Sequence, residues 1–206
     1  MEQQLYKLPE GWEWQPLSSV TEVVGGGTPK TKVPEYWGGD VVWLSPTVLP
    51  AIGELTYISD SSKKITKNGL AKSSARLVPA GAVVYSTRAT IGKIAIAGCD
   101  LATNQGFTNF ICSDELYNRY LAYVLVRQTQ AIASLSNSTT FKEVSKTNIK
   151  SVETPLPPLN EQKRIVAKLD ALSERTRTLE AETQERLGQL IALKSSLLDT
   201  AFRGQL

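Results

Sequence analysis

The chain has 206 residues, of which 41% are hydrophobic, and a formal net charge of +3 at neutral pH. This length is enough for one hydrophobic core and an appendage, and the mildly basic balance permits nucleic-acid binding without indicating it. The sequence contains no histidine, which excludes a histidine-based catalytic triad and a histidine metal site.

The two cysteines, Cys99 and Cys112, lie in apolar surroundings and lack the spacing of metal ligands. We therefore expect two buried free thiols in a reducing cytoplasm. The segment from Met1 to Lys7 has no apolar core, so no signal peptide is expected. No apolar run approaches the length of a membrane span, and we expect a cytoplasmic protein.

Short apolar runs alternate with polar loops over the first three quarters of the chain, which predicts a mixed α/β head. The predicted strands are Val41–Leu44, Ala82–Ser86, Lys93–Ala97 and Phe107–Ile111. Turns are expected at Tyr36–Asp40 and at Asn68–Gly69. A helix with an apolar face is expected from about Glu115 to Arg127, capped by Ser113 or Asp114.

A proline-rich segment, Thr154–Leu159, is typical of a stiff linker. After it, residues 160–204 contain no proline and one internal glycine, Gly188. Leucine and isoleucine recur there at spacings of three and four, which predicts one helix of about 43 residues, roughly 64 Å long. Asn160 is expected as its N-cap and Gly204 as the residue that ends it.

The apolar stripe of this helix is expected to be a dimerisation seam. Its members are Ile165, Leu169, Leu172, Leu179, Leu187, Leu190 and Leu197. An ordinary amphipathic helix on a core is the alternative, but the length favours a coiled coil. The expected fold is therefore α+β, with a globular head (residues 1–155) and a helical arm (residues 156–206) in an antiparallel coiled coil with a second copy.

Polar loops of the head combine lysine, hydroxyl and amide side chains, which suit duplex DNA. Lysine and hydroxyl groups bind phosphates, whereas arginine, asparagine and glutamine can read base edges. The candidates are Thr28, Lys30, Thr31, Lys32, Lys63, Lys64, Arg88, Thr90, Asn104, Gln105, Thr139 and Lys142. Taken alone, each loop is better explained as solvated surface. Asn104 and Gln105 could brace their own loop, and Arg88 could pair with an acid in the fold.

The sequence offers no sign of catalysis. Gly25-Gly26-Gly27 lacks the Gly-Lys-Ser/Thr ending of a phosphate-binding loop, and no pair of acids has catalytic spacing. The triplet Glu161-Gln162-Lys163 stands at a helix start, where capping explains it. We expect a chain with no catalytic residues, cofactor or metal of its own.

Several short motifs are spaced along nearly the whole chain. They are Leu8–Trp12 (LPEGW), Gly26–Lys30 (GGTPK), Pro34–Asp40 (PEYWGGD), Trp43–Leu44, Leu77–Gly81 (LVPAG), Thr87–Lys93 (TRATIGK), Thr103–Phe107 (TNQGF), Pro155–Val166 (PLPPLNEQKRIV) and Ala201–Gly204 (AFRG). Each motif is weak alone, but their order and spacing are highly specific. On these motifs the chain resembles, at half length, the specificity subunits of type I restriction-modification systems.

This resemblance implies a target recognition domain that reads one half of a split site in double-stranded DNA. It also implies a helical spacer that docks adenine methyltransferase subunits, which carry S-adenosylmethionine, and a motor-nuclease subunit for restriction. A usual member has two domains and two spacers, so this chain is either a natural half-subunit that homodimerises or a fragment. Two antiparallel copies would read an interrupted palindrome. A coiled-coil adaptor with a protein-binding head is the alternative, and a small hydrolase is disfavoured.

Overall fold

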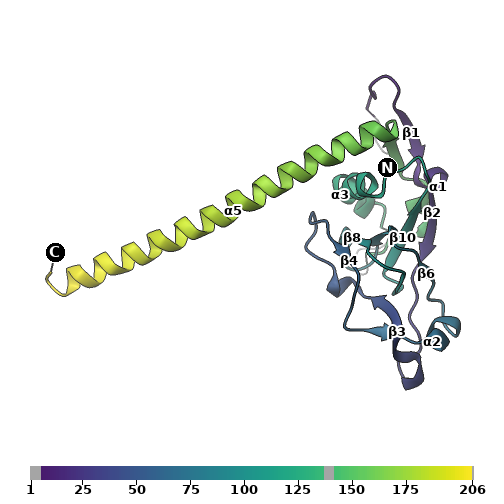
Figure 1. The fold of residues 1–206 in the computed structure, drawn as a ribbon, viewed down its shortest axis with the longest axis horizontal. Helices are drawn as coiled ribbons and strands as arrows, with labels where there is room; N and C mark the ends of the chain where they lie inside the picture. The colour runs from purple at the N-terminus through teal and green to yellow at the C-terminus, as the bar shows by residue number, and fades with distance from the viewer. Residues whose placement is uncertain (1–5, 137–141, 206) are drawn as a thin grey trace. The chain divides into compact units, whose positions relative to one another are not determined.

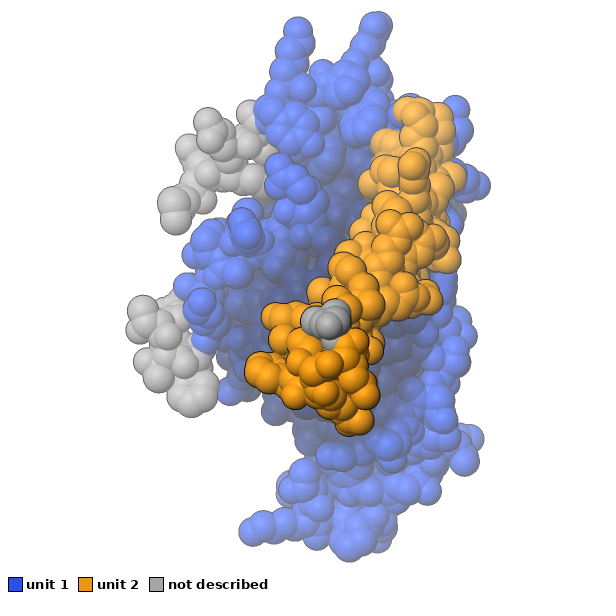
Figure 2. Space-filling model, turned by 90° about the vertical axis from the view of Figure 1, so that its left-hand side faces the viewer, with its two compact units in different colours: residues 1–163 blue, residues 164–206 orange. Residues whose placement is uncertain are grey.

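The computed structural model describes residues 6–136 and 142–205 (Figure 1). The chain forms two compact units, residues 1–163 and 164–206, which Figure 2 distinguishes by colour. The sequence suggested a division between residues 155 and 156, whereas the compact units divide eight residues later, inside the long helix. The first turn of that helix therefore belongs to the head.

Two larger sheets build the head. The first has the strand order β2 (Thr21–Gly25), β10 (Phe107–Cys112), β7 (Val83–Ser86), β8 (Ile94–Ala97) and β4 (Tyr57–Ile58). The second has the order β5 (Lys64–Ile65), β3 (Trp37–Leu44), β9 (Leu101–Thr103) and β6 (Leu77–Val78). Most pairs are antiparallel, but β4–β8 and β3–β9 are parallel. Apolar side chains from both sheets share one core, including Val84, Phe107, Leu44 and Leu101.

Helices complete the head. They are α1 (Leu17–Val20), α2 (Lys67–Ala71), α3 (Asn118–Ser134) and α4 (Lys146–Lys150), with short 3-10 turns η1 (Pro34–Tyr36) and η2 (Pro46–Val48). The helix α3 packs against β7 and β8 and buries Leu121, Leu125 and Ile132. Its amphipathic pattern was therefore a correct guide to the face that it covers.

The predicted strands are confirmed, but some predicted boundaries are wrong. The expected turn at Tyr36–Asp40 is mostly strand, because β3 begins at Trp37 and absorbs Gly38, at φ +77°, in an irregularity before Val41. The expected turn at Asn68–Gly69 lies in α2, where the Thr66 hydroxyl accepts a hydrogen bond from the Gly69 amide. The helix α3 begins at Asn118 rather than near Glu115, and neither Ser113 nor Asp114 caps it.

The proline-rich segment Thr154–Leu159 is not a linker. Residues Glu153–Leu156 form β11, which pairs with β1 (Glu13–Pro16) in a two-stranded antiparallel sheet. Pro155 lies opposite Trp14, and proline is tolerated there because each strand of such a pair keeps one free edge. This pairing ties the segment before the long helix to the beginning of the head.

The long helix α5 (Leu159–Phe202) has 44 residues, close to the predicted length. It begins one residue before Asn160, which is therefore inside the helix rather than its N-cap. Its end follows the prediction. The Gly204 amide, at φ +68°, donates to the Ala201 carbonyl and the Gln205 amide donates to Thr200, a Schellman motif.

Both cysteines are free, but each is half-buried rather than buried as expected. The Cys99 thiol donates to the Ser59 carbonyl. Burial raises the pKa of the Cys112 thiol to about 12, so it stays protonated at neutral pH. None of the described helices is long and apolar enough to cross a membrane.

We predict that Gly26→Ala destabilises the head. A Cβ at this position would lie 1.8 Å from the Asn104 carbonyl oxygen, so the backbone would have to move. The free energy of unfolding should fall by about 2–3 kcal/mol in urea denaturation. The control is Gly188→Ala, where a Cβ meets no atom within 4 Å, and it should stabilise the helix by about 0.5–1 kcal/mol. Equal stability of Gly26→Ala and the parent would contradict this close approach.

Candidate nucleic-acid interface

Strand pairing brings several loops to one edge of the head. Gly25 at the end of β2 lies opposite Thr108, and Ser86 at the end of β7 lies opposite Phe107. At the ends of β3 and β9, Leu44 lies beside Thr103. The loops that follow β2, β3, β7 and β9 therefore leave from the same side. We call these segments, residues 26–33, 45–48, 87–92, 104–106 and 142–144, the loop rim.

The glycine run starts the loop rim because backbone segments meet there. The Gly27 amide donates to the Thr103 carbonyl over 2.8 Å, and the Trp43 indole donates to the Gly27 carbonyl over 3.0 Å. A Cβ at Gly27 would lie 2.3 Å from the Ala75 nitrogen. The run is therefore a close backbone contact between the two sheets, in keeping with its lack of a phosphate-loop motif.

Beyond this contact, the first loop carries exposed basic side chains. Lys30, Thr31 and Lys32 are exposed, and the Lys30 carbonyl accepts a hydrogen bond from the Trp37 indole. Trp37 packs edge-to-face on Trp43, with their ring centroids 5.1 Å apart. The aromatic pair therefore holds the loop through the Lys30 carbonyl. The side chains of Lys30 and Lys32 remain exposed and available to a phosphate backbone.

Thr28 and Gln105 meet although they are far apart in the sequence. The Thr28 hydroxyl donates to the Gln105 side-chain oxygen, and the rest of the exposed Gln105 amide remains at the surface. Asn104 has a different role, since its side-chain oxygen accepts from the Gly106 amide over 2.8 Å. Asn104 thus braces its loop, as the alternative interpretation of the sequence held, while Gln105 combines bracing with exposure.

Arg88 and Thr90 lie on a loop that backbone bonds hold firmly. The Ala89 amide donates to the Lys142 carbonyl over 2.9 Å, and the Val144 amide donates to Thr87 over 3.0 Å. Between them, the Arg88 guanidinium lies 3.6 Å from the Glu143 carboxylate. The alternative that Arg88 pairs with an acid is therefore correct, although both side chains remain about half exposed. Ala89 has φ +60°, an uncommon conformation for a residue other than glycine.

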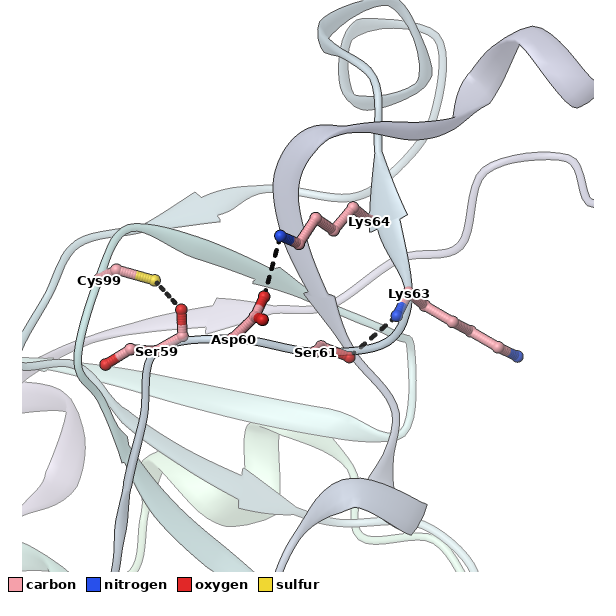
Figure 3. A network of polar contacts seen from close by, with 6 residues as sticks. All are labelled: Ser59, Asp60, Ser61, Lys63, Lys64 and Cys99. Carbon is pink, nitrogen blue, oxygen red and sulfur yellow. Dashed lines mark hydrogen bonds and ion pairs between the residues drawn. The ribbon is translucent and has the colours of Figure 1, made fainter.

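Lys63 and Lys64 lie outside the loop rim, Lys63 at the end of the loop between β4 and β5 and Lys64 as the first residue of β5 (Figure 3). Lys64 is paired with Asp60 at 3.0 Å, and its hydrogen bond is the main cause that lowers the pKa of the Asp60 carboxyl. Lys63 makes its bond to Ser61 through its backbone amide, and its side chain extends away from the network. Within the described residues, Lys64 is already paired with Asp60, whereas the Lys63 side chain leads away from this network.

The structure thus brings Thr28, Lys30, Thr31, Lys32, Arg88, Thr90, Asn104, Gln105 and Lys142 to one rim. It places Lys63 and Lys64 elsewhere, and Thr139 lies outside the described residues. Glu143 is an additional member that the sequence pattern did not single out, because only the fold brings it to Arg88. Over residues 6–136 and 142–205, no group of three or more potential metal-ligating side chains is found.

Comparison with known proteins gives a consistent result. Residues 9–189 match the model of the type I restriction modification DNA specificity domain. The chain is 39% identical over 165 residues to the type I restriction enzyme MjaIX specificity subunit of Methanocaldococcus jannaschii, covering 79% of this chain and 38% of the relative. It is 27% identical over 184 residues to the EcoR124I/EcoR124II specificity subunit of Escherichia coli, covering 85% of this chain and 45% of the relative.

Solved structures agree on the fold. One from a study of assembly and conformational transition of the type I R-M system has a TM-score of 0.78 and 25% identity, over all of this chain and 49% of that one. The HsdS subunit from Thermoanaerobacter tengcongensis has a TM-score of 0.70 and 23% identity, over all of this chain and 48% of that one. The chain therefore spans about half the length of the proteins that it matches.

We predict that Lys30→Gln combined with Lys32→Gln weakens DNA binding to all sequences alike. Removing one phosphate-binding charge should flatten the plot of log affinity against log salt concentration by about one unit, so the double variant should be flatter by about two. Fluorescence anisotropy with duplex DNA over a salt series measures this slope. The control is Lys7→Gln, since the exposed Lys7 precedes β1 and is distant in sequence from the loop rim. If the slope of the double variant equals that of the parent, Lys30 and Lys32 do not contact DNA phosphates.

Proposed function

Because the chain belongs to the family of type I restriction modification DNA specificity domains, we propose that it is a non-catalytic, sequence-specific DNA-binding subunit that reads one half of a bipartite site. The observation that carries the proposal is the family match over residues 9–189, which includes the whole loop rim. The rim presents cationic groups for phosphates beside Arg88 and Gln105, which have the donors needed for base edges. The described residues supply DNA-binding chemistry in one place.

The recognition domain comprises residues 1–155 in this proposal, and residues 156–206 form the spacer and dimerisation arm. The chain spans only 38% and 45% of the two relatives described above, so one head accounts for one half-site. A complete reader of two half-sites then needs a second head. A second copy of this chain supplies it with the fewest assumptions.

The exposed stripe of α5 supports pairing between copies. Leu172, Leu179, Leu187, Leu190 and Leu197 are all exposed on the helix surface, while Ile165 and Leu169 near its start are half-buried. A row of exposed leucines of this length, interrupted by Thr176 and Thr183, is unusual on a surface that remains in water. An antiparallel pair of arms would bury it and place one head at each end, with two-fold symmetry. The target would then be an interrupted palindrome.

We infer the remaining partners from the resemblance to the family. Adenine methyltransferase subunits would dock on the arms and carry S-adenosylmethionine, and a motor-nuclease subunit would be needed for restriction. Because DNA and these partners are cytoplasmic, we infer that the chain acts in the cytoplasm. This chain would contribute recognition and spacing but no bond chemistry.

The test is co-purification with the methyltransferase subunit, followed by mapping of methylated adenines in DNA. An interrupted palindrome in which the two half-sites are inverted copies would support the proposal. A continuous or asymmetric target, or no sequence preference, would overturn it.

We predict that Leu179→Lys breaks the dimer. Each copy would lose about 1.5 kcal/mol or more of apolar burial, so dissociation should become easier by roughly 100-fold for the pair. Analytical ultracentrifugation at micromolar concentration measures the change. Ala181→Lys adds the same charge at an exposed position on the opposite side of the helix and should leave the dimer intact. A parent chain that sediments as a monomer would contradict the seam.

A further inference from the structure

Gln162, in the first turn of α5, is completely buried, with an exposed fraction of 0%. It belongs to the head unit, residues 1–163. Capping of the helix start was enough to explain its neighbours from the sequence, but capping does not require a buried amide. A buried polar side chain usually persists because its hydrogen bonds are satisfied.

The side chain of Gln162 makes three hydrogen bonds to backbone groups. Its Nε2 donates to the Glu115 carbonyl over 2.8 Å and to the Pro157 carbonyl over 2.9 Å. Its Oε1 accepts from the Tyr117 amide over 2.8 Å. Both amide donors and one acceptor position are thus used, and only a primary amide of this length can serve all three partners.

Two of these partners, Glu115 and Tyr117, lie just before α3 and join the start of α5 to it, whereas Pro157 lies just before α5 itself. Tyr117 is the N-cap residue of α3 and makes no side-chain cap of its own. The strand β11, which precedes α5, is held by the same helix: the Tyr120 hydroxyl donates to the Pro155 carbonyl over 2.8 Å, and the Gln128 amide donates to Glu153 over 2.9 Å. Because α3 is itself buried against β7 and β8, the first turn of α5 is joined to the sheet that carries the loop rim.

Reading two half-sites demands that each head be held accurately. One extra base pair in the gap moves a half-site by about 3.4 Å along the DNA and turns it by roughly 35°. If the start of α5 could move in the head by this distance or angle, the two heads could bind half-sites separated by more than one gap length. Displacing the first turn of α5 from α3 requires the Glu115 carbonyl and the Tyr117 amide to lose their buried partner, which opposes such movement.

We propose that Gln162 is a positioning residue that restricts the gap between the two half-sites by fixing the first turn of α5 in the head. This role rests on the proposed function and adds to it, because Gln162 contacts no base. Half-site sequence would be read at the loop rim, and half-site spacing would depend on this buried amide. The two properties are then separable by mutation.

The inference is tested by selecting random-sequence duplex DNA for binding to the 206-residue chain and sequencing the bound DNA. The variants are Gln162→Glu, which keeps the acceptor but turns a carboxylate towards two carbonyl oxygens, and Gln162→Ala. The matched control is Gln184→Glu, at an exposed position of α5. We expect the parent and the control to select one gap length, and the Gln162 variants to select the same half-sites at two or more gap lengths.

The outcomes separate this inference from the proposed function. If the parent selects no pair of half-sites, the proposed function fails and the inference falls with it. If the parent selects one gap and both Gln162 variants keep that gap with the same affinity, the inference alone is wrong. Uniform loss of binding to every sequence would also overturn it, because Gln162 would then be needed for the head rather than for spacing.

Amide hydrogen exchange gives a second readout that needs no DNA. Removal of the Gln162 hydrogen bonds should speed exchange of the Tyr117 amide and of the first turns of α5 by about 10-fold or more. Exchange in β10 should stay unchanged, because the sheets remain folded. Equal acceleration in β10, or none at Tyr117, would contradict a local positioning role.

Discussion

The backbone pairing of β10 with β2 on one side and β7 on the other is the interaction on which the head depends. It aligns Gly25, Ser86 and Phe107 at one end of a sheet, although they come from distant parts of the chain. Several loops of the rim leave this end of the sheet. They are held by backbone bonds to each other, such as those of Gly27 with Thr103 and of Thr87 with Gly106. The candidate DNA-binding surface is therefore a product of strand register.

Local patterns in the sequence predicted the parts of the fold that depend on local periodicity. The alternating or continuous apolar runs gave the strands around Val83, Ile94 and Phe107, and the regular leucines gave α5 almost to its last residue. The strand β11 could not be predicted, because Pro155 and the two prolines that follow it resemble a linker, and its partner β1 lies near the start of the sequence. Strands that pair although they are this far apart in the sequence cannot be recognised from a short stretch of residues.

The candidate site was predictable in its residue types but not in its contacts. Lysines, hydroxyls and amides in polar loops indicated DNA, yet only the fold distinguishes Lys64, which is paired with Asp60, from the extended Lys63 side chain. The same holds for Asn104, which braces its loop, and for Arg88, whose partner Glu143 comes from a later segment. Gln162 was the least predictable, because a polar residue in the first turn of a helix is normally exposed.

The way in which the loop rim is built bears on how its preference could change over evolution. The loops are linked to one another mostly by main-chain hydrogen bonds. A Cβ at Gly26 or Gly27 would lie 1.8 Å or 2.3 Å from a backbone atom, so neither position has room for a side chain. Such a framework does not depend on the identity of the exposed side chains at positions such as Thr31 and Thr90. Substitutions there can change the DNA sequence that is recognised without altering the backbone framework or the arm. A change of specificity therefore need not lower the stability of the fold.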